Sequence, residues 1–396
     1  MRNPRVLILT TTFLPVVGGV QYFLKWFLDN LDRRLARTED IEVHFAYPNA
    51  EAHEYVQFEN IETHSLVFHG GGRSELARLS IRIGRLLRKI KPEIVHCHAV
   101  SPDGLCVLLA SRMFGVPIDL VVTSHGQDLV SLPEMNYGSL RTVRGRLIAR
   151  QVTRRLSTHV VVSKAMVNRA VDAGTPRHRV EVIHNGVPMS GDLDFECGDP
   201  VDVSAELPPL PGGGIYILSL SSGRRVKNLS GLIEAMSLTA DRLGSSKLIL
   251  ACTGPLSASV VHHVRDKGLS DRVVFCGELT GARKRAYFEA SEVYCLASHF
   301  EAFGLVALEA MKFGAAVVAT KEGGPADFIQ HESNGLLVAA SDPQDIASAL
   351  TRLYRAPSLR SRLTSNARET VRGFSISSVV ERHLAVYHRG FAEQRV

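Results

Sequence analysis

Short, uninterrupted runs of valine, isoleucine and leucine recur along the 396-residue chain, and amphipathic stretches separate them. Such runs are typical of strands in a parallel sheet, because helices then cover both faces of the sheet. Between Val20 and Leu31, apolar side chains recur three and four residues apart, which predicts a helix after the first strand. In the first half we expect strands at residues 6–10, 42–48, 94–98, 119–126, 159–164 and 180–186.

The alternation stops at residues 187–214, which are rich in Pro, Gly and Asp, and then resumes. We expect further strands at residues 215–221, 247–254, 273–277, 293–298, 315–320 and 335–339, and helices at 229–240, 343–354 and 375–387. The prediction is an α/β protein with two tandem Rossmann-like, doubly wound domains, residues 1–190 and 213–374, joined by a linker at 191–212. We expect a carboxy-terminal helix in residues 375–396 to pack back on the first domain. Ligands bind beyond the carboxyl ends of such strands, so the cleft between the domains is the expected site.

Composition narrows the class of protein. The formal net charge of +6 and the sequence pI of about 9.0 are too mildly basic to indicate a nucleic-acid binder. The six cysteines form no CxxC pair and lie mostly in apolar runs, which is typical of buried thiols in a reducing compartment. The amino-terminal apolar stretch is short for a signal peptide, and no run of 18 apolar residues occurs. We therefore expect a cytoplasmic protein.

Glycines and polar residues gather where the expected strands of the first domain end. Gly18 and Gly19 precede a helix, which is compatible either with a plain turn or with an anion site on the helix amides. His125 ends a strand in the sequence SHGQD, where it either has a polar role or belongs to a turn in which Asp128 opens the next helix.

Two groups of side chains are considered as metal ligands. His96 and His98 alternate onto one face of a strand, but no acidic or sulfur partner is close in the sequence, so a metal site is disfavoured. The carboxylates of residues 192–194 lie in the linker rather than at a strand end, and chance is the better interpretation. No metal site is therefore expected.

Two glutamates, Glu301 and Glu309, stand eight residues apart in an otherwise small and apolar segment. A loop followed by a helix would place them about 12 Å apart along the axis if all intervening residues were helical. A diphosphate on the helix amino terminus would then leave one carboxylate for sugar hydroxyls and the other for a ribose. This would give a partner to Glu309, whose unpaired burial would be costly. A lone glutamate at the solvent edge of a helix is the alternative.

The segment EAFGLVALEAMKFGAAVVAT, followed by GGPADFI and NGLLV, resembles the nucleotide-sugar site of retaining family-4 glycosyltransferases with the GT-B fold, which carry an E-x7-E element. The motifs GGVQ, SHGQD, VVSK, HNGV, KN and VVFCGEL occur in the order found in that family. Each motif alone is weak, whereas the ordered set is specific. The resemblance extends from Val6 to about Leu353.

The resemblance implies roles for matching residues of both domains. Gly18 and Gly19 would contact the donor phosphate through their backbone, and His125 would lie beside the donor sugar. Lys227 would neutralise the leaving diphosphate, and Glu301 would hold sugar hydroxyls.

For the helix that follows, the resemblance implies that Phe303, Gly304 and Leu305 present backbone amides to sugar and phosphate. Glu309 would bind the ribose hydroxyls, and the VVFCGEL loop would flank the base.

Two departures from the family pattern concern the phosphate loop and a later turn. The family usually has Gly-Arg five or six residues before the lysine, where this chain has Ser221 and Ser222, so Arg224 or Arg225 would supply the charge. The later GG-x-x-E appears as GGPAD, with Asp327 in the acidic position.

The function implied is a metal-independent, retaining hexosyltransferase. It would use a nucleoside-diphosphate sugar, with uridine favoured over GDP-mannose, and a hydroxyl of a glycan, lipid-linked or small-molecule acceptor. A nucleotide-sugar epimerase of the same fold and a non-catalytic nucleotide-sugar-binding subunit are the alternatives. No cofactor is expected.

Two basic stretches bear on a membrane partner. Residues 73–91 carry a row of basic side chains beside an apolar stripe, and residues 141–155 hold six arginines and no acid. Such helices either dock on anionic lipid at the inner face of the membrane or pack their apolar stripe on the sheet with solvated arginines.

Overall fold

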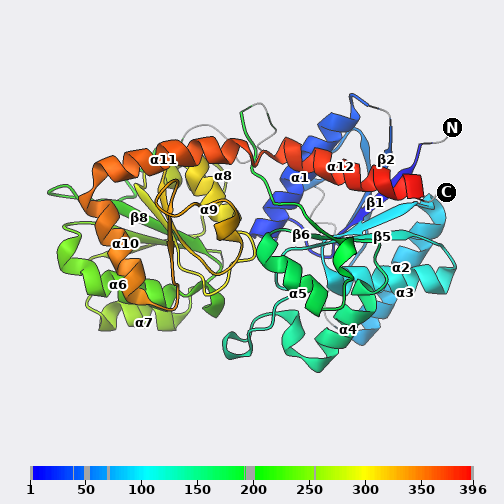
Figure 1. Ribbon diagram of the computed structural model, residues 1–396, viewed down its shortest axis with the longest axis horizontal. Coiled ribbons are helices and arrows are strands. Elements are labelled where there is room, and N and C mark those ends of the chain that lie inside the picture. Colours follow the sequence, from blue (N-terminus) through cyan, green and yellow to red (C-terminus); the bar gives the residue numbers. More distant parts are fainter. Residues whose placement is uncertain are drawn as a thin grey trace. The chain divides into compact units, whose positions relative to one another are not determined.

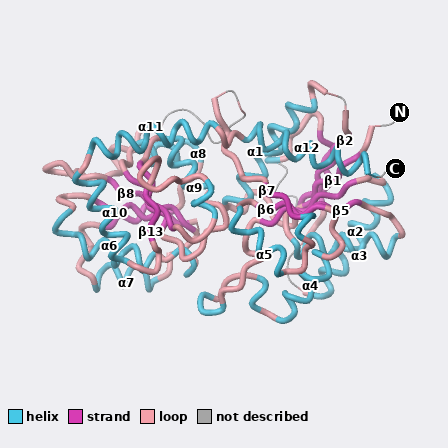
Figure 2. The backbone as a smooth tube through the Cα atoms, in the orientation of Figure 1, coloured by secondary structure: helices cyan, strands magenta, loops and turns pink. Residues whose placement is uncertain are grey.

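The computed structural model describes residues 3–38, 40–48, 54–68, 72–190, 192, 201–253 and 256–393. The chain divides into two compact units: unit 1, made of Met1–Leu193 and Ile376–Val396, and unit 2, Asp194–Ser375. Each unit has one parallel sheet with helices packed around it (Figures 1 and 2). Much of the expected linker lies outside the described residues.

Unit 1 contains a parallel sheet in the order β3-β2-β1-β4-β5-β6-β7. Its strands are β1 (Arg5–Leu9), β2 (Glu42–Tyr47), β3 (Ile61–Ser65), β4 (Ile94–Cys97), β5 (Asp119–Ser124), β6 (Thr158–Val161) and β7 (Val180–Val182). The strands β2 and β3 follow one another on one side of β1, whereas β4 to β7 follow one another on its other side. The strand order therefore reverses between β1 and β4, and the carboxyl ends of these two strands form the switch point where ligands bind in such sheets.

The helices of unit 1 follow the strands in the order that a doubly wound sheet requires. They are α1 (Gly19–Leu35), α2 (Arg73–Ile90), α3 (Leu105–Phe114), α4 (Val143–Thr153), α5 (Val167–Asp172) and α12 (Ile376–Glu393). The last of these returns from unit 2 and packs on α1 and β4, where the ring of His383 meets Phe27 at 5.0 Å and the hydroxyl of Tyr387 lies 2.6 Å from His96 Nδ1.

Unit 2 contains a second parallel sheet in the order β10-β9-β8-β11-β12-β13. Its strands are β8 (Tyr216–Ser221), β9 (Lys247–Cys252), β10 (Val273–Gly277), β11 (Val293–Leu296), β12 (Ala316–Thr320) and β13 (Leu336–Val338). Its helices are α6 (Leu229–Thr239), α7 (Ala258–Asp266), α8 (Gly281–Glu289), α9 (Leu305–Phe313), α10 (Pro343–Arg355) and α11 (Pro357–Arg372). Here the switch point lies between β8 and β11.

Burial explains why the strands form where the apolar runs occur. Every residue of β4, β11 and β12 is buried, as expected for strands covered on both faces. Several elements had no predicted range, among them the edge strand β3 and the helix α11. Within the described residues, no helix combines the length and the apolar character needed to cross a bilayer.

Candidate active site

The loops that follow β8 and β11 bring Lys227 and Glu301 together at the switch point of unit 2. Lys227 ends a 3-10 turn, Arg225–Lys227, and its Nζ lies 2.6 Å from Glu301 Oε2. Ser298 Oγ donates a hydrogen bond to the same carboxylate oxygen at 3.3 Å. The sequence places these two residues 74 positions apart, so the contact is a product of the sheet order.

Backbone contacts fix the position of Glu301. Its amide donates to Glu322 O at 3.2 Å, and the amide of Gly324 donates to Glu301 O at 2.8 Å. Only glycine fits this approach, because a Cβ on Gly323 would lie 2.0 Å from Glu301 O and the φ of Gly323 is +121°. Asp327 ends the 3-10 turn, Gly324–Asp327, that carries these glycines.

Helix α9 begins directly after this loop. Gly304 is its N-cap, with a φ of +98°, and the amides of Leu305 and Val306 precede the first amides that donate to Gly304 O, so they have no acceptor within the helix. The ring of Phe303 is buried against Phe328 and Phe374, with centroids 5.3 and 6.3 Å away. The segment Phe303–Leu305 therefore offers backbone rather than side chains to an anion at the positive end of the helix.

Glu309 lies one turn into α9, and its carboxylate already has a partner within the protein. Lys284 Nζ of α8 lies 2.8 Å from Glu309 Oε1, and both side chains are only 6% exposed. The expectation that a ribose is needed to compensate this buried charge is corrected by this ion pair. The spacing is corrected as well, because α9 starts at Leu305 and residues 301–304 are not helical.

The two arginines considered for the phosphate loop are both exposed. Arg224 and Arg225 follow Gly223, whose φ is +66°, and the amide of Lys227 donates to Arg224 O at 2.8 Å. The turn therefore buries Val226 and leaves the arginine side chains at the surface beside Lys227.

The carboxyl ends of β1, β4 and β5 bring together the candidate residues of unit 1. Gly18 caps α1, which begins at Gly19. His125, after β5, packs its ring on Phe23 of α1 with centroids 5.5 Å apart, and its Nε2 lies 3.2 Å from Nδ1 of His98, after β4.

Burial controls the charge of His125. It lowers the pKa of the imidazole to about 3, so the ring is neutral near pH 7. Nδ1 of His125 and Nε2 of His98 are buried without a hydrogen-bond partner in the described structure. A neutral ring with an unused nitrogen can exchange a hydrogen bond with a ligand hydroxyl but supplies no positive charge.

The structure gives Asp128 and His96 contacts that differ from those considered in the sequence. No helix starts at Asp128; instead its carboxylate accepts hydrogen bonds from Ser124 Oγ at 2.7 Å and from the amide of Val100 at 3.1 Å, which ties two loops together. The nitrogens of His96 are used internally, with Nε2 lying 2.8 Å from Thr123 Oγ1 and Nδ1 bonded to the Tyr387 hydroxyl. Of the carboxylates in the linker, Asp194 lies outside the described residues.

Three residues of these sites were not identified from the sequence in their present roles. Lys284 has no motif around it, and His98 was considered only as a metal ligand. Asp103, in the short π-helix Val100–Gly104 after β4, accepts a hydrogen bond from Thr11 Oγ1 at 2.5 Å, and burial raises its pKa to about 7. Its signal is the turn sequence SPDG.

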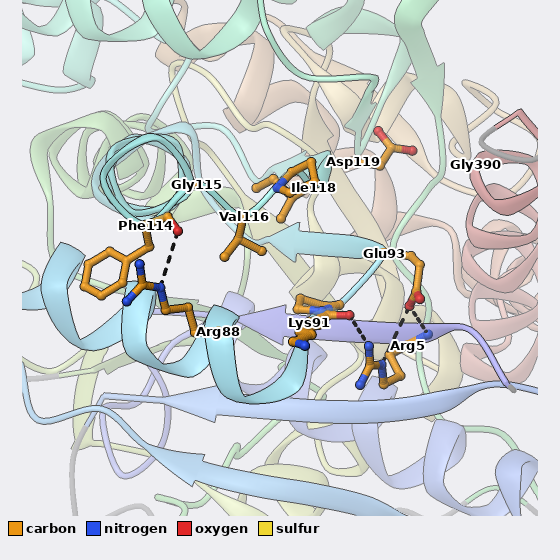
Figure 3. A pocket seen from close by; sticks show the side chains of 12 residues that line it. Arg5, Arg88, Lys91, Glu93, Phe114, Gly115, Val116, Ile118, Asp119 and Gly390 are labelled. Atoms are coloured by element: carbon orange, nitrogen blue, oxygen red, sulfur yellow. Dashed lines mark hydrogen bonds and ion pairs between the residues drawn. The ribbon is translucent and has the colours of Figure 1, made fainter.

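A cavity of about 950 Å³ opens at the amino ends of central strands of the unit 1 sheet, away from their carboxyl ends (Figure 3). Its lining includes Arg5, Glu93 and Asp119, which stand at the amino ends of β1, β4 and β5. Arg88 donates to Phe114 O at 3.4 Å across its other side. Since ligands of doubly wound sheets bind at carboxyl ends, this cavity is separate from the candidate active site.

Two doubly wound units, each with polar residues at its switch point, define a two-domain α/β architecture of the GT-B type. Residues 18–190 match the family model Glycosyltransferase Family 4, and residues 205–370 match the model Glycosyl transferases group 1. The chain belongs to the family-4 type of GT-B glycosyltransferases, and it is therefore a glycosyltransferase.

Relatives and solved structures agree with this assignment. The chain is 30% identical to D-inositol 3-phosphate glycosyltransferase of Frankia alni, over 77% of this chain and 76% of that protein. It is 24% identical to N-acetyl-alpha-D-glucosaminyl L-malate synthase of Bacillus anthracis, over 78% of each. HepE of Anabaena, solved with UDP and glucose, superposes with a TM-score of 0.77 at 18% identity, over 98% of this chain and all of that one. Sucrose-phosphate synthase of Thermosynechococcus elongatus gives 0.77 at 20% identity, over 99% and 100%.

Proposed function

We propose that the protein transfers a sugar from a nucleoside-diphosphate sugar, with UDP favoured, to a hydroxyl of a glycan, glycolipid or small-molecule acceptor, with retention of configuration. The observation that carries this proposal is the contact of Lys227 with Glu301 in the loop before α9, with Glu309 one turn inside the helix. The structure of HepE with UDP and glucose and the inositol-phosphate and malate acceptors in the names of the relatives support a nucleotide donor and a hydroxyl acceptor.

We propose a task for each group of unit 2. A diphosphate at the start of α9 would meet the helix amides and compete with Glu301 for Lys227, because both anions need the same ammonium group. The released carboxylate of Glu301 would then accept hydrogen bonds from sugar hydroxyls. Lys227, the neighbouring arginines and the amides would supply the positive charge that stabilises the leaving diphosphate, without a metal.

For Glu309 we propose binding of the ribose hydroxyls through Oε2, since Lys284 contacts Oε1. For His125 we propose a hydrogen bond to the donor sugar from its neutral ring. The acceptor would react on the face that the diphosphate leaves, and the leaving phosphate would take the acceptor proton.

Calorimetric titration with UDP and with GDP tests the donor site. We expect selective micromolar binding of UDP by the wild type and a loss of that binding in Glu309→Gln. Thermal unfolding of the nucleotide-free variant separates lost binding from lost folding, which matters because Glu309 is in a buried ion pair. Absence of binding of either nucleotide by a folded wild type would contradict the proposed donor class.

Turnover tests the role of Glu301. The Glu301→Ala variant should lose most of its sugar transfer, because the carboxylate would no longer hold the sugar hydroxyls. A sugar-transfer rate close to that of the wild type would contradict the assignment of Glu301 to the donor sugar. Product analysis without an acceptor distinguishes transfer from epimerisation, since an epimerase converts its nucleotide sugar with no acceptor present.

We further propose that unit 1 docks on anionic lipid through α4 rather than α2. The apolar stripe of α2 is buried in the core, whereas Val143 and Leu147 of α4 are 64% and 58% exposed among exposed arginines. A cavity of about 520 Å³ beside α4 is lined in part by Val143, Leu147, Arg146, Arg150 and Arg169.

Vesicle sedimentation tests this surface. Vesicles with anionic lipid should retain the wild type at low salt, and the Val143→Glu/Leu147→Glu variant should stay in solution. Arg82→Gln on α2 is the matched control and should sediment as the wild type does. Equal sedimentation of all three proteins, or none by the wild type, would contradict docking through α4.

A further inference from the structure

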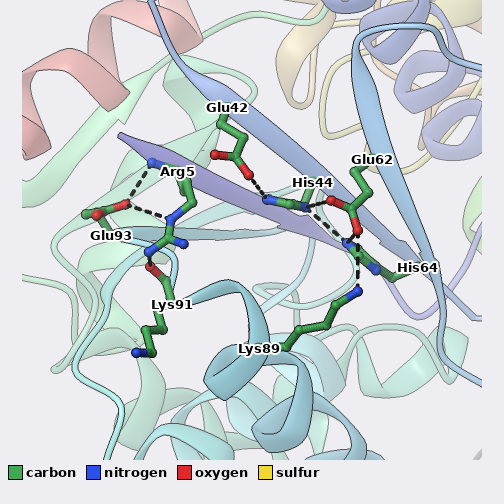
Figure 4. A network of polar contacts seen from close by, with 8 residues as sticks. All are labelled: Arg5, Glu42, His44, Glu62, His64, Lys89, Lys91 and Glu93. Atoms are coloured by element: carbon green, nitrogen blue, oxygen red, sulfur yellow. Dashed lines mark hydrogen bonds and ion pairs between the residues drawn. The ribbon is translucent and has the colours of Figure 1, made fainter. Parts of the chain in front are cut away.

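The edge of the unit 1 sheet carries the same three-residue pattern twice. Strand β2 begins with Glu-Val-His at residues 42–44, and β3 contains Glu-Thr-His at residues 62–64. The two strands are parallel neighbours, and His44 stands opposite Glu62. Because side chains two residues apart share a face, all four polar groups point to the same side of the sheet (Figure 4).

The distances within this cluster fit a tetrahedral metal ion. Nδ1 of His44 lies 3.1 Å from Nε2 of His64 and 3.4 Å from Glu62 Oε2, and His64 Nε2 lies 3.7 Å from Glu62 Oε1. Bonds of about 2.0–2.1 Å to a tetrahedral zinc ion place its ligand atoms about 3.3 Å apart. Two imidazoles and one carboxylate, with a fourth position open to water, form a ligand set that zinc uses in proteins.

The surroundings hold the ligands in place. The side chains of His44 and His64 are only 4% and 10% exposed. Nε2 of His44 lies 2.9 Å from Glu42 Oε1, and a hydrogen bond donated by Nε2–H to this carboxylate leaves the Nδ1 lone pair for the cluster. A carboxylate bonded to the far nitrogen of a histidine is the usual second contact of a metal-bound imidazole.

We propose that His44, His64 and Glu62 bind one zinc ion that fastens the edge strand β3 to β2. Within the described part of the chain, they are the one group of histidine, cysteine and carboxylate side chains with ligand atoms close enough for this. The site lies on a different strand pair from the candidate active site, so this zinc would be structural and takes no part in sugar transfer.

The protons of the metal-free cluster follow from the same contacts. When Nε2–H of His44 donates a hydrogen bond to Glu42, Nδ1 of His44 can accept one from Nε2–H of His64. On binding, the His64 proton moves to its Nδ1, and both facing nitrogens give their lone pairs to the ion.

Lys89 of α2 opposes the ion. Its Nζ lies 3.5 Å from Glu62 Oε1, and its side chain is 69% exposed, so it can swing into solvent when a metal takes its place. Removing this competing charge should strengthen metal binding. We expect Lys89→Met to bind zinc about 2- to 5-fold more tightly than the wild type. The effect is small because an exposed ion pair such as Lys89–Glu62 contributes little free energy.

The test uses the reduced, untagged full-length protein, stripped with chelator and titrated with zinc against a chromophoric competitor. We expect one tight equivalent in the wild type and at least about tenfold weaker binding in His64→Ala and Glu62→Gln. His388→Ala is the matched control, because His388 is an exposed histidine of unit 1 that lies 3.3 Å from a carboxylate, Asp40. It should bind zinc as the wild type does.

Thermal unfolding gives a second readout. Zinc should raise the unfolding temperature of the wild type and of His388→Ala but not of His64→Ala, because only a folded site gains from binding. Glu62→Gln keeps the shape of an exposed side chain and should therefore fold as the wild type does. It replaces His64→Ala in this test if His64→Ala proves unstable. Equal zinc affinity in all variants, or weaker binding in Lys89→Met, would overturn the proposal.

Discussion

At the scale of single residues, Lys284 and Glu309 compensate each other inside unit 2, at a distance of 2.8 Å. Removing one partner leaves the other charge buried, which costs about 3–5 kcal/mol. We expect Lys284→Met and Glu309→Gln each to lower the free energy of unfolding of unit 2 by about 3 kcal/mol, and the double variant to lose far less than both together. Urea denaturation followed by circular dichroism measures these losses.

The double variant also separates folding from binding. It should be folded at 25 °C and yet bind UDP more weakly than the wild type, because the ribose would lack its acceptor. Losses of stability that simply add would show that the two charges are solvated independently. Full UDP affinity in the folded double variant would remove Glu309 from the proposed donor site.

The sequence could indicate these residues only in part. Glu301 and Lys227 stood out because each belongs to a recognisable motif, but their contact depends on two loops brought together by β8 and β11. Lys284 carried no signal, since a lysine in a helix is usually solvated and its burial depends on α8 packing against α9.

At the scale of elements, the position of the loop before α9 depends on glycines in the loop after β12. A Cβ on Gly324 would lie 2.3 Å from Ala302 O and 2.4 Å from Phe303 Cα. We expect Gly324→Ala to displace this loop by up to an ångström and to lower kcat/KM about 100-fold. Steady-state sugar transfer at saturating acceptor measures the effect.

A second glycine of unit 2 provides the control. Gly373, after α11, has a right-handed φ of −73°, and a Cβ there would lie 3.4 Å from Thr370 O, an ordinary contact. Gly373→Ala should therefore keep nearly full activity. Similar losses in both variants would mean that the effect of Gly324→Ala comes from general destabilisation of unit 2.

The edge strand β3 and the helix α11, which had no predicted range, have weak apolar patterns. In β3 only Ile61 is buried, because the other side chains of this edge strand are polar and half-buried or exposed. In α11 the buried side chains are Leu363, Ala367 and Val371, one per turn, among charged and polar residues. The central strands were predicted because burial on both faces leaves an uninterrupted apolar run.

At the scale of the whole molecule, buried histidines are concentrated in unit 1, and they make its stability depend on pH. Burial lowers the pKa of His125 and His159 to about 3 and that of His383 to about 4. In the unfolded chain these groups titrate near 6.5, so acid is taken up on unfolding. Burial lowers the pKa of His96 and His98 as well, whereas it raises the pKa of Asp103 to about 7 and also raises the pKa of Asp128 and Asp29, and these carboxyls act in the opposite sense.

The stability from the histidines is therefore complete above about pH 6.5 and is lost as the pH falls towards 4. Near pH 5 the unfolded state binds about two more protons than the folded state, so the free energy of unfolding of unit 1 should fall by about 2–3 kcal/mol for each pH unit of acidification.

Trp26, the one tryptophan of the chain, is buried in α1 and reports on the unfolding of unit 1. Its fluorescence in urea titrations at pH 7 and pH 5 measures the change. His159→Gln should reduce the slope by about 1.4 kcal/mol per pH unit, whereas His388→Gln, at an exposed position, should leave it unchanged. An unfolding midpoint that is the same at both pH values would show that the buried histidines are charged in the folded protein or that acid acts elsewhere.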